Sequence, residues 1–311
     1  MIKTQPVSCN LCGSKNASNY CKAKDLLHGV EGEYDYVKCN DCGLVYMNPQ
    51  VITEDLPKLY PDSYAPHFSG SKKKRFGVLS DICNYLMTMA KIKKRIYDNL
   101  NDKSRVLDVG CGAGSILNKI RNKTGCEVYG VDISENAVKS AKKFFNVDVF
   151  HGDIKEAAWP ENYFDVITAW QYLEHVPDPN QNIEKMSHLL KNDGTLILAV
   201  PNHTSLHAKL FKNKWYPLDC PRHLCIYSPQ TMTTLLQKYG LEVEDIVYDI
   251  TPWGLVGSLQ YLVFGDNVNL KTKNLISTSR LLRVLLFPWT ILLGLLKCSD
   301  GIIVYARKTK K

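Results

Sequence analysis

Residues 105–114 read Arg-Val-Leu-Asp-Val-Gly-Cys-Gly-Ala-Gly. The apolar residues predict a short buried strand that runs into a loop with glycine at every second position, namely Gly110, Gly112 and Gly114. Glycine lets backbone N–H groups approach a ligand where a side chain would block it. A helical stretch (115–123) follows at once, and the start of a helix offers unpaired N–H donors and a partial positive charge. This strand–loop–helix unit therefore predicts a site for a nucleotide-bearing cofactor.

Two acidic residues narrow the choice of cofactor. Asp132 follows a second short apolar strand (127–131), at roughly the 20-residue offset at which an acidic side chain accepts ribose hydroxyls in dinucleotide-binding βαβ units. However, Ser115 stands where the dinucleotide pattern G-x-G-x-x-G requires its last glycine. Asp108, which precedes the first glycine, would suit an ammonium group better than a pyrophosphate. The pattern therefore indicates a nucleoside cofactor that also carries a positive charge.

The order D-x-G-x-G-x-G followed by G-x-D resembles motif I and its sequel in class I S-adenosylmethionine (SAM) methyltransferases. Residues 170–179, which read WQYLEHVPDP, look like the L-E-H-V-x-D-P segment of the ubiquinone-type and related small-molecule methyltransferases. In that family an acidic residue after the third strand, here Asp153, contacts the adenine amino group. The cofactor-binding residues that the resemblance implies are Asp108, Gly110, Gly112, Gly114, Asp132, Ile133, Asp153, Ile154, Trp170 and Gln171.

The rest of the predicted sheet follows the same family order. Strands three to seven are predicted at 147–150, at 162–170, in a run that closes at Pro201, at 241–249 and at 301–307. The last two are antiparallel neighbours in class I methyltransferases. We therefore expect an α/β fold with a Rossmann-like seven-stranded class I methyltransferase sheet, preceded by a small N-terminal zinc ribbon.

The zinc ribbon is predicted from two C-x-x-C pairs, Cys9 with Cys12 and Cys39 with Cys42, each followed by glycine. Two thiolates at this spacing can grip one face of a tetrahedral ion, and the glycine permits the turn that aims backbone N–H groups at sulfur. A four-thiolate site has no open position, so the expected Zn²⁺ is structural. A pair of disulfides or a redox dithiol is the alternative. The eleven cysteines show no pairing pattern and no signal-peptide core is apparent, which favours a reducing cytoplasm.

Two further segments resemble enzymes of glycan biosynthesis. Residues 36–49 are similar to the zinc-binding domain of some sugar methyltransferases, where it helps to cover the acceptor. Residues 215–224 resemble a W-x-x-x-D-x-P-R-H-L segment of glycan-cluster methyltransferases. Because oxygen and carbon acceptors usually need a base, His175 and His223 are the candidate catalytic residues. Either histidine can instead hold a loop, and Tyr60 can stack on a sugar ring or simply pack in a core.

A second pair of histidines, His203 and His207, has the spacing H-x-x-x-H but no third ligand nearby in the sequence. We expect these two residues to lie on the surface or in a loop.

The net charge of +8 is confined to one end of the chain. Residues 271–311 carry nine basic residues and one acidic residue, which accounts for the whole net charge. The electroneutral remainder disfavours nucleic acid as a partner, because phosphate neutralisation dominates that affinity. Two uncharged runs lie between 252 and 296, each shorter than the ~20 residues that cross a bilayer. With their tryptophans and flanking basic residues they predict peripheral contact with an anionic membrane. A helical lid or a dimer contact is the alternative.

These observations predict a SAM-dependent methyltransferase that acts on a sugar or a lipid-linked small-molecule acceptor, in surface-glycan or related biosynthesis. It would work in the cytoplasm, at the inner face of the membrane. An RNA methyltransferase with an N-terminal zinc module and a non-catalytic SAM-binding adaptor remain alternatives. The expected parts are a zinc ribbon (1–50), a linker and helical cap (51–101), a SAM-binding core (102–249 with 300–308) and an apolar helical insertion (250–299).

Overall fold

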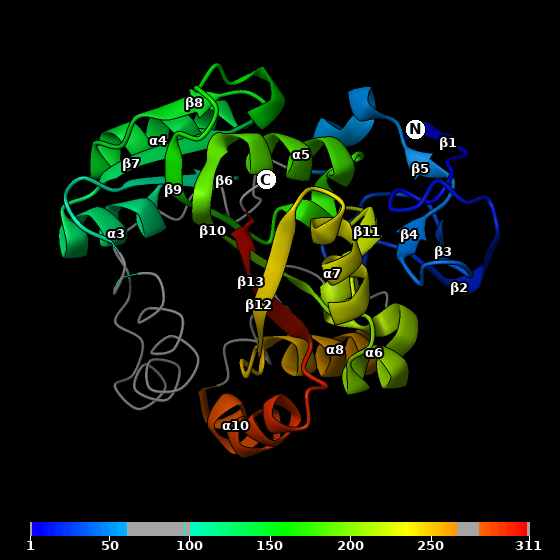
Figure 1. The fold of residues 1–311 in the computed structure, drawn as a ribbon. Coiled ribbons are helices and arrows are strands. Elements are labelled where there is room, and N and C mark those ends of the chain that lie inside the picture. The colour runs from blue at the N-terminus through cyan, green and yellow to red at the C-terminus, as the bar shows by residue number, and fades with distance from the viewer. Residues whose placement is uncertain (1, 61–96, 98–99, 266–279, 310–311) are drawn as a thin grey trace.

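The computed structural model describes residues 2–60, 97, 100–265 and 280–309. Its centre is a seven-stranded sheet in the order β12-β13-β10-β9-β6-β7-β8 (Figure 1). The strands are β6 (Arg105–Val109), β7 (Glu127–Asp132), β8 (Val149–His151), β9 (Phe164–Trp170), β10 (Leu190–Pro201), β12 (Leu241–Tyr248) and β13 (Gly301–Lys308). Only β13 runs against its neighbours, pairing antiparallel with both β10 and β12. The predicted seven-stranded Rossmann-like sheet is confirmed.

The third strand begins later than predicted. The sequence predicts it at 147–150, whereas β8 begins at Val149. Asn146 adopts the left-handed conformation (φ 49°), and the N–H of Val147 donates to the Ala141 carbonyl at 3.3 Å. These two residues therefore end the preceding helix, and the strand starts two residues later than predicted.

Helices cover both faces of the sheet. They are α3 (Ser115–Thr124), α4 (Glu135–Phe145), α5 (Pro179–Leu189), α6 (Leu206–Phe211), α7 (Pro229–Gln237), α8 (Trp253–Phe264) and α10 (Arg280–Leu295). Val106 and Leu107 are adjacent on β6 but belong to separate hydrophobic cores, because successive strand residues point to opposite faces. One core contains Leu117 of α3 and the other contains Ile183 of α5.

The N-terminal part contains two smaller sheets. β1 (Thr4–Gln5) pairs with β5 (Gln50–Val51), and a four-stranded sheet has the order β11-β4-β3-β2. Its strands are β2 (Ala17–Ala23), β3 (Tyr34–Cys39), β4 (Val45–Met47) and β11 (Cys225–Ile226). β11 comes from the middle of the chain, so residues beyond 1–50 complete this sheet. Leu44 and Tyr46 also lie in the same hydrophobic core as Leu107 of the central sheet.

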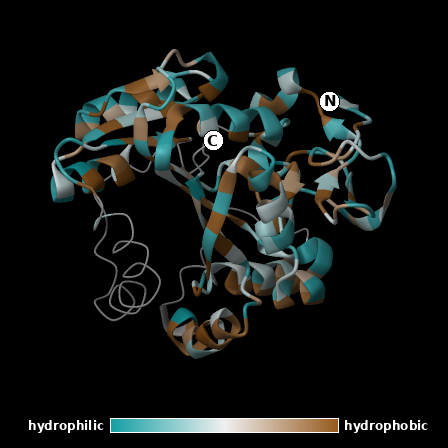
Figure 2. Cartoon of the chain, in the orientation of Figure 1, coloured by the Kyte–Doolittle hydropathy of each residue, from teal (hydrophilic) through white to brown (hydrophobic). Residues whose placement is uncertain are grey.

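The chain between β12 and β13 forms α8 and α10, which lie side by side at one end of the molecule (Figure 1). Apolar residues dominate both helices (Figure 2). Pro288 lies within α10. Among the described residues, neither helix nor any other has the length and apolarity that a bilayer crossing requires. Most of the predicted helical cap lies outside the described residues. The described part of this predicted cap includes the short 3₁₀ helix η1 (Thr53–Leu59).

Candidate active site

The glycine loop after β6 is shaped by close backbone packing. Gly110, Gly112 and Gly114 all have positive φ angles, of 70°, 53° and 74°. The N–H of Gly110 donates to the Val131 carbonyl at 2.8 Å. A Cβ atom on residue 110 would lie 2.6 Å from Cδ2 of Tyr172. The loop can therefore keep this backbone path only with glycine at position 110. Because glycine has no side chain, the backbone of the loop faces the sheet edge.

Asp132 and Asp108 end adjacent strands beside this loop. Oδ2 of Asp132 accepts a hydrogen bond from the Gly112 N–H at 2.8 Å, and Oδ1 accepts one from the Ser134 N–H at 2.9 Å. Oδ1 of the buried Asp108 accepts from the Thr168 hydroxyl at 2.6 Å. Burial raises the pKa of Asp108 to about 7, and the negative charge of Asp132 adds to the effect. A cationic ligand would favour the ionised form of Asp108.

The other predicted cofactor residues divide into exposed and buried groups. Ile133 is 70% exposed immediately after Asp132, an unusual place for a large apolar side chain without a ligand. Asp153 begins the short helix η3 (Ile154–Glu156) as its N-cap and accepts from the Lys155 N–H at 2.9 Å. Ile154 is fully buried, so its side chain packs in the core and only its backbone can face a cofactor.

Trp170 and Gln171 follow at the end of β9. The indole N–H of Trp170 is buried and has no acceptor among the residues that the structure describes. Gln171 adopts a left-handed conformation (φ 50°) and donates its N–H to the Ala199 carbonyl at 2.9 Å. An orphan buried donor and a strained turn beside a glycine loop are features of a ligand site. The loop, the exposed Ile133 and this donor together fit SAM.

The two candidate catalytic histidines lie together, although 48 positions separate them in the sequence. Their ring centroids are 4.5 Å apart. His175 ends the short helix η4 (Leu173–His175) after β9, and His223 lies just before β11. Nδ1 of His175 lies 3.2 Å from the Arg222 carbonyl, and Nδ1 of His223 lies 2.9 Å from the Pro217 carbonyl. Because a carbonyl only accepts, both Nδ1 atoms carry the proton. Each Nε2 therefore keeps a lone pair.

Glu174 lies beside this histidine pair. Its side chain is fully buried, and neither carboxylate oxygen has a hydrogen-bond partner within the described part of the chain. Nε2 of His223 is 3.9 Å from Oε1 of Glu174, beyond hydrogen-bond distance. Burial raises the pKa of Glu174 to about 8 and lowers the pKa of His175 to about 3. Burial therefore favours the uncharged forms of both side chains, and a bound cation would favour ionisation of Glu174.

Comparison with known proteins agrees with this geometry. Residues 84–246, just over half of the chain, match the family described as "Methyltransferase domain". The chain belongs to this methyltransferase family. It is 30% identical over 165 residues to the ubiquinone biosynthesis O-methyltransferase of Xanthomonas euvesicatoria pv. vesicatoria (strain 85-10), covering 48% of this chain and 68% of that one. It is 38% identical over 164 residues to the enzyme of the same name in Coxiella burnetii (strain Dugway 5J108-111), covering 50% and 64%.

Solved structures support the fold of this SAM-dependent methyltransferase. A putative methyltransferase from Bacillus halodurans C-125 superposes with a TM-score of 0.52 at 19% identity, covering 72% of this chain and 99% of that one. The [4+2]-cyclase SpnF superposes with a TM-score of 0.51 at 18% identity, covering 78% and 86%. Since one of these neighbours is named a cyclase, likeness of fold alone does not fix the reaction.

The four cysteines of the methyltransferase come together as predicted. Their Sγ atoms all lie within 4.8 Å of one another. The N–H of Gly13 donates to the Cys9 carbonyl and that of Gly43 to the Cys39 carbonyl, which closes both turns. Burial would raise the pKa of the Cys39 thiol, but backbone N–H groups of Cys42 and Asp41 outweigh it and lower the pKa to about 7. The donor set Cys9, Cys12, Cys39 and Cys42 fits a tetrahedral Zn²⁺.

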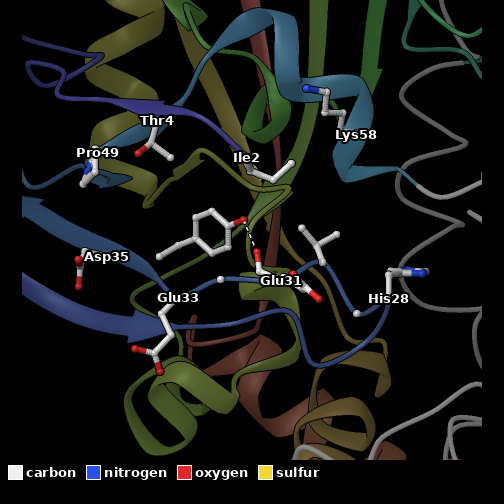
Figure 3. Close-up of a pocket in the computed structure, with 12 residues that line it drawn as sticks. Ile2, Thr4, His28, Glu31, Glu33, Asp35, Pro49 and Lys58 are labelled. Carbon is white, nitrogen blue, oxygen red and sulfur yellow. Dashed lines mark hydrogen bonds between the residues drawn. The ribbon is translucent and has the colours of Figure 1, made fainter.

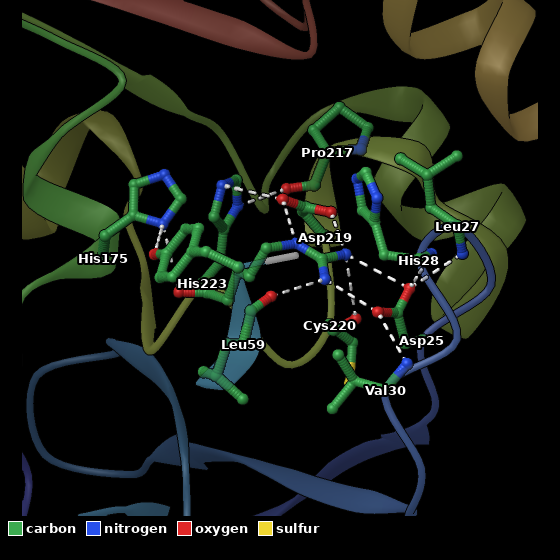
Figure 4. Close-up of polar contacts among 12 residues, drawn as sticks. Asp25, Leu27, His28, Val30, Leu59, His175, Pro217, Asp219, Cys220 and His223 are labelled. Carbon is green, nitrogen blue, oxygen red and sulfur yellow. Dashed lines mark hydrogen bonds and ion pairs between the residues drawn. The ribbon is translucent and has the colours of Figure 1, made fainter. Parts of the chain in front are cut away.

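A buried ion pair, which the sequence does not predict, lies next to the histidines of the methyltransferase (Figure 4). The Arg222 guanidinium donates to Asp25 at 2.7 Å and to Asp219 at 2.7 Å. The hydroxyl of Tyr60 lies 2.9 Å from Nδ1 of His175. Asp25 and Tyr60 both come from the N-terminal part, which therefore contributes to the surroundings of the histidine pair.

The expectation that His203 and His207 are surface or loop residues holds only for His203, which lies in the turn between β10 and α6, and is wrong for His207, which lies within α6. Both are buried, at 6% and 2% exposure. Nδ1 of His207 lies 2.7 Å from Oδ2 of Asp300, and the Trp289 indole N–H donates to Nε2 of His207 at 3.2 Å. These contacts tie α6 to α10 and to the start of β13. His207 is therefore a packed structural residue, buried because an acid distant in sequence pairs with it.

A cavity of about 870 Å³ opens within the N-terminal part (Figure 3). Its wall includes Glu31, Glu33 and Asp35, with Lys58 on the opposite side. None of the residues that line it comes from the glycine loop or from β9. It is therefore separate from the cofactor site, and its acidic wall would favour polar or cationic groups.

Proposed function

We propose that this methyltransferase transfers the methyl group of SAM to an oxygen atom of a sugar or lipid-linked small molecule, in surface-glycan or related biosynthesis. The printed names of the relatives, O-methyltransferases of ubiquinone biosynthesis, support an oxygen acceptor. The observation that carries the proposal is that the cofactor loop and the candidate catalytic histidines lie at the same edge of the central sheet. The glycine loop follows β6, and His175, which has the His223 ring beside it, follows the parallel neighbour β9. Open α/β sheets bind ligands at this carboxyl edge.

In this proposal the acidic residues hold the cofactor. Asp132 accepts the ribose hydroxyls, Asp153 accepts the adenine amino group, and Asp108 faces the positively charged end of SAM. The reaction itself is an in-line displacement at the methyl carbon. A bond forms between the acceptor oxygen and the methyl carbon as the sulfur–methyl bond breaks. Positioning of the two reactants supplies much of the rate.

His175 and His223 are proposed to take the proton that the acceptor hydroxyl loses. Both imidazoles are neutral and keep a lone pair on Nε2, which is the state that a general base needs. His175 is partly exposed and lies beside the Tyr60 hydroxyl. An acceptor that approaches from the N-terminal part would therefore meet the histidine pair first, which agrees with a role of that part in covering the acceptor.

A structural Zn²⁺ on the four cysteines and a membrane contact complete the proposal. Leu285 and Leu295 of α10 are 65% and 75% exposed, and Val263 of α8 is 68% exposed. Arg283 and Lys297 flank the exposed residues of α10 in the sequence. Exposed apolar residues flanked by cations suit the interface of an anionic membrane. A membrane-bound position would bring the enzyme to a lipid-linked acceptor.

The test is a labelling experiment. Purified enzyme is incubated with methyl-labelled SAM and an extract of its own cells, and the products are divided between organic and aqueous phases. We expect label in the organic phase, or in a nuclease-resistant aqueous sugar fraction. Label that nuclease treatment releases would overturn the proposal in favour of RNA. The Asp132→Ala variant controls for label that arises without this enzyme, and the absence of any enzyme-dependent label would favour a SAM-binding adaptor.

A further inference from the structure

The most unusual polar group in the structure is the carboxylate of Glu174. It is completely buried, and both of its oxygens lack a hydrogen-bond partner among the described residues. Leaving a buried carboxylate without partners is costly, and native structures almost always compensate for it. Asp108, the other deeply buried acid near the site, has the Thr168 hydroxyl as its partner. Glu174 therefore calls for a cationic ligand that the protein chain does not itself supply.

The two neighbouring imidazoles are arranged as ligands of the same cation. Ligand atoms of Glu174, His175 and His223 all lie within 4.8 Å of one another. Both histidines direct Nδ1–H to backbone carbonyls, those of Arg222 and Pro217. This hydrogen bond to the outer nitrogen is the arrangement that fixes the tautomer of metal-ligating histidines. It leaves the two Nε2 lone pairs for a metal ion.

The local charge also favours a dication. Within the described residues, the charged groups that face this cluster are the Asp219 carboxylate, 3.8 Å from Nε2 of His223, and the Arg222 guanidinium. Asp25 neutralises Arg222 from the other side at 2.7 Å. With Glu174 ionised there are three carboxylates and one guanidinium, a net charge of −2. One divalent cation would bring this buried group to neutrality.

We propose that Glu174, His175 and His223 bind a divalent transition-metal ion such as Zn²⁺ or Mn²⁺. Two imidazoles and one carboxylate are a common ligand set for such ions, and three protein ligands leave positions open. Ligands at ~2.1 Å from one ion lie at most ~4.2 Å apart, so three side chains whose ligand atoms lie within 4.8 Å of one another need only a small movement to reach one ion. The partly exposed edge of His175 gives the ion a way in.

The metal site deepens the proposed function and rests on it in one respect, since the open positions would hold the acceptor oxygen. In the metal-bound enzyme the two Nε2 atoms are ligands, and the ion rather than an imidazole favours loss of the hydroxyl proton. In the metal-free enzyme the histidines keep the role of base. Metal binding itself requires neither SAM nor an acceptor, so it is measured separately from methyl transfer.

The experiment compares metal content in matched variants. Wild type, Glu174→Gln and His223→Gln are loaded with excess Zn²⁺, desalted and weighed by native mass spectrometry. Glu184→Gln and His188→Gln serve as controls, because both side chains are exposed on α5 and lie outside the cluster. We expect each site variant to hold one Zn²⁺ fewer than wild type and each control to match wild type. The comparison holds whatever the four cysteines bind, since they are unchanged throughout.

Equal zinc content in wild type and both site variants would overturn the proposal. A second measurement covers variants that fail to fold. Wild type is titrated with Mn²⁺ and followed by electron paramagnetic resonance. Thiolates select softer ions, so Mn²⁺ reports on nitrogen and oxygen ligands. We expect wild type to bind one Mn²⁺ per chain, and we expect the affinity for Mn²⁺ to fall at least tenfold in whichever site variant folds. Absence of Mn²⁺ binding together with unchanged zinc content would refute the site.

Discussion

Arg222 donates from Nη1 to Oδ2 of Asp25 at 2.7 Å, although 197 positions separate the two residues in the chain. Both side chains are almost completely buried, with 1% and 0% of their surface exposed. Asp25 also accepts the N–H groups of Leu27 and His28. The loop that carries Asp25 is therefore fixed to the segment that carries His223. The N-terminal part is attached to the methyltransferase core by charge as well as by apolar packing.

Removal of Asp25 tests this attachment. In the Asp25→Ala variant Arg222 keeps one of its two carboxylate partners, Asp219, so a buried charge loses half of the negative charge that compensates it. Breaking a buried ion pair in this way costs about 3–5 kcal/mol, and we expect that loss in the free energy of unfolding in urea. Asp35→Ala is the control, because Asp35 pairs with Lys22 at 3.6 Å in an exposed position. A loss below about 1 kcal/mol for Asp25→Ala would show that the pair is not a structural tie.

Replacement of Asp132 by alanine tests the cofactor assignment. The variant removes the carboxylate that orients the Gly112 N–H and that would accept the ribose hydroxyls. We expect SAM binding to disappear in calorimetry while the circular dichroism spectrum stays unchanged. Asp148→Ala is the control, since Asp148 is exposed and pairs only with the exposed Lys142 at 2.6 Å. Unchanged SAM affinity in the Asp132 variant would remove Asp132 from the site.

The ionisation of Asp108 predicts a pH dependence of SAM binding. Its pKa is raised to about 7, so the carboxyl is neutral below pH 7 and charged above it. A cationic ligand binds the charged form, so affinity should rise with pH through 7 and fall about tenfold per pH unit well below it. The same shift makes stability fall as pH rises towards 7, because the folded state holds this proton more tightly than the unfolded state.

Calorimetric titrations with SAM between pH 5.5 and 8.5 check this prediction. The Asp108→Asn variant should bind SAM weakly, with an affinity that no longer changes near pH 7. A wild-type affinity that stays constant from pH 6 to 8 would mean that Asp108 does not face the charged end of the cofactor.

Replacement of Cys39 by serine tests how far the metal-binding cysteines support the fold. Cys39 lies in the hydrophobic core shared with the central sheet. We expect loss of the metal ion and faster hydrogen exchange at 2–52 and at 225–227, where β11 completes the N-terminal sheet. Exchange at 127–151, on the far side of the central sheet, should stay slow. If exchange accelerates only within 2–52, β11 is held in place independently of the metal-binding cysteines.

The exposed face of α8 and α10 predicts membrane binding. Leu285→Glu and Leu295→Glu place charge on this surface, and each removes about 1.5–3 kcal/mol of apolar burial at a membrane interface. We expect at least tenfold weaker sedimentation with vesicles that contain phosphatidylserine. Leu210→Glu is the control, because Leu210 is 65% exposed on α6. Equal vesicle binding by wild type and both α10 variants would assign this face to another contact.

The sequence predicts the central sheet well because its signals are local. The short apolar run of β6, the glycines at 110–114 and the residues after them specify strand, loop and helix within twenty residues of chain. The pairing of cysteines is predictable for the same reason, since each C-x-x-C turn fixes two of the four ligands. The ubiquinone-type segment is equally local and contains His175, one of the two candidate catalytic residues.

The contacts that the sequence does not predict are formed between residues that lie far apart in the chain. Nothing in the residues around Asp25 indicates an arginine at 222, and His207 is buried only because Asp300 pairs with it. Nothing in the sequence around Glu174 indicates that its side chain is fully buried within the turn of η4. The cavity beside Glu31 has no sequence signal at all, because it is formed by backbone paths and not by a motif.

The position of β11 in the N-terminal sheet has a consequence for synthesis of the chain. β4 ends at Met47, whereas its neighbour β11 begins at Cys225. A ribosome that adds 5–20 residues each second needs roughly 10–35 s to cover this interval. During that time β4 has an open edge, and the four cysteines have already emerged. Early metal capture would hold the nascent sheet together until its last strand arrives.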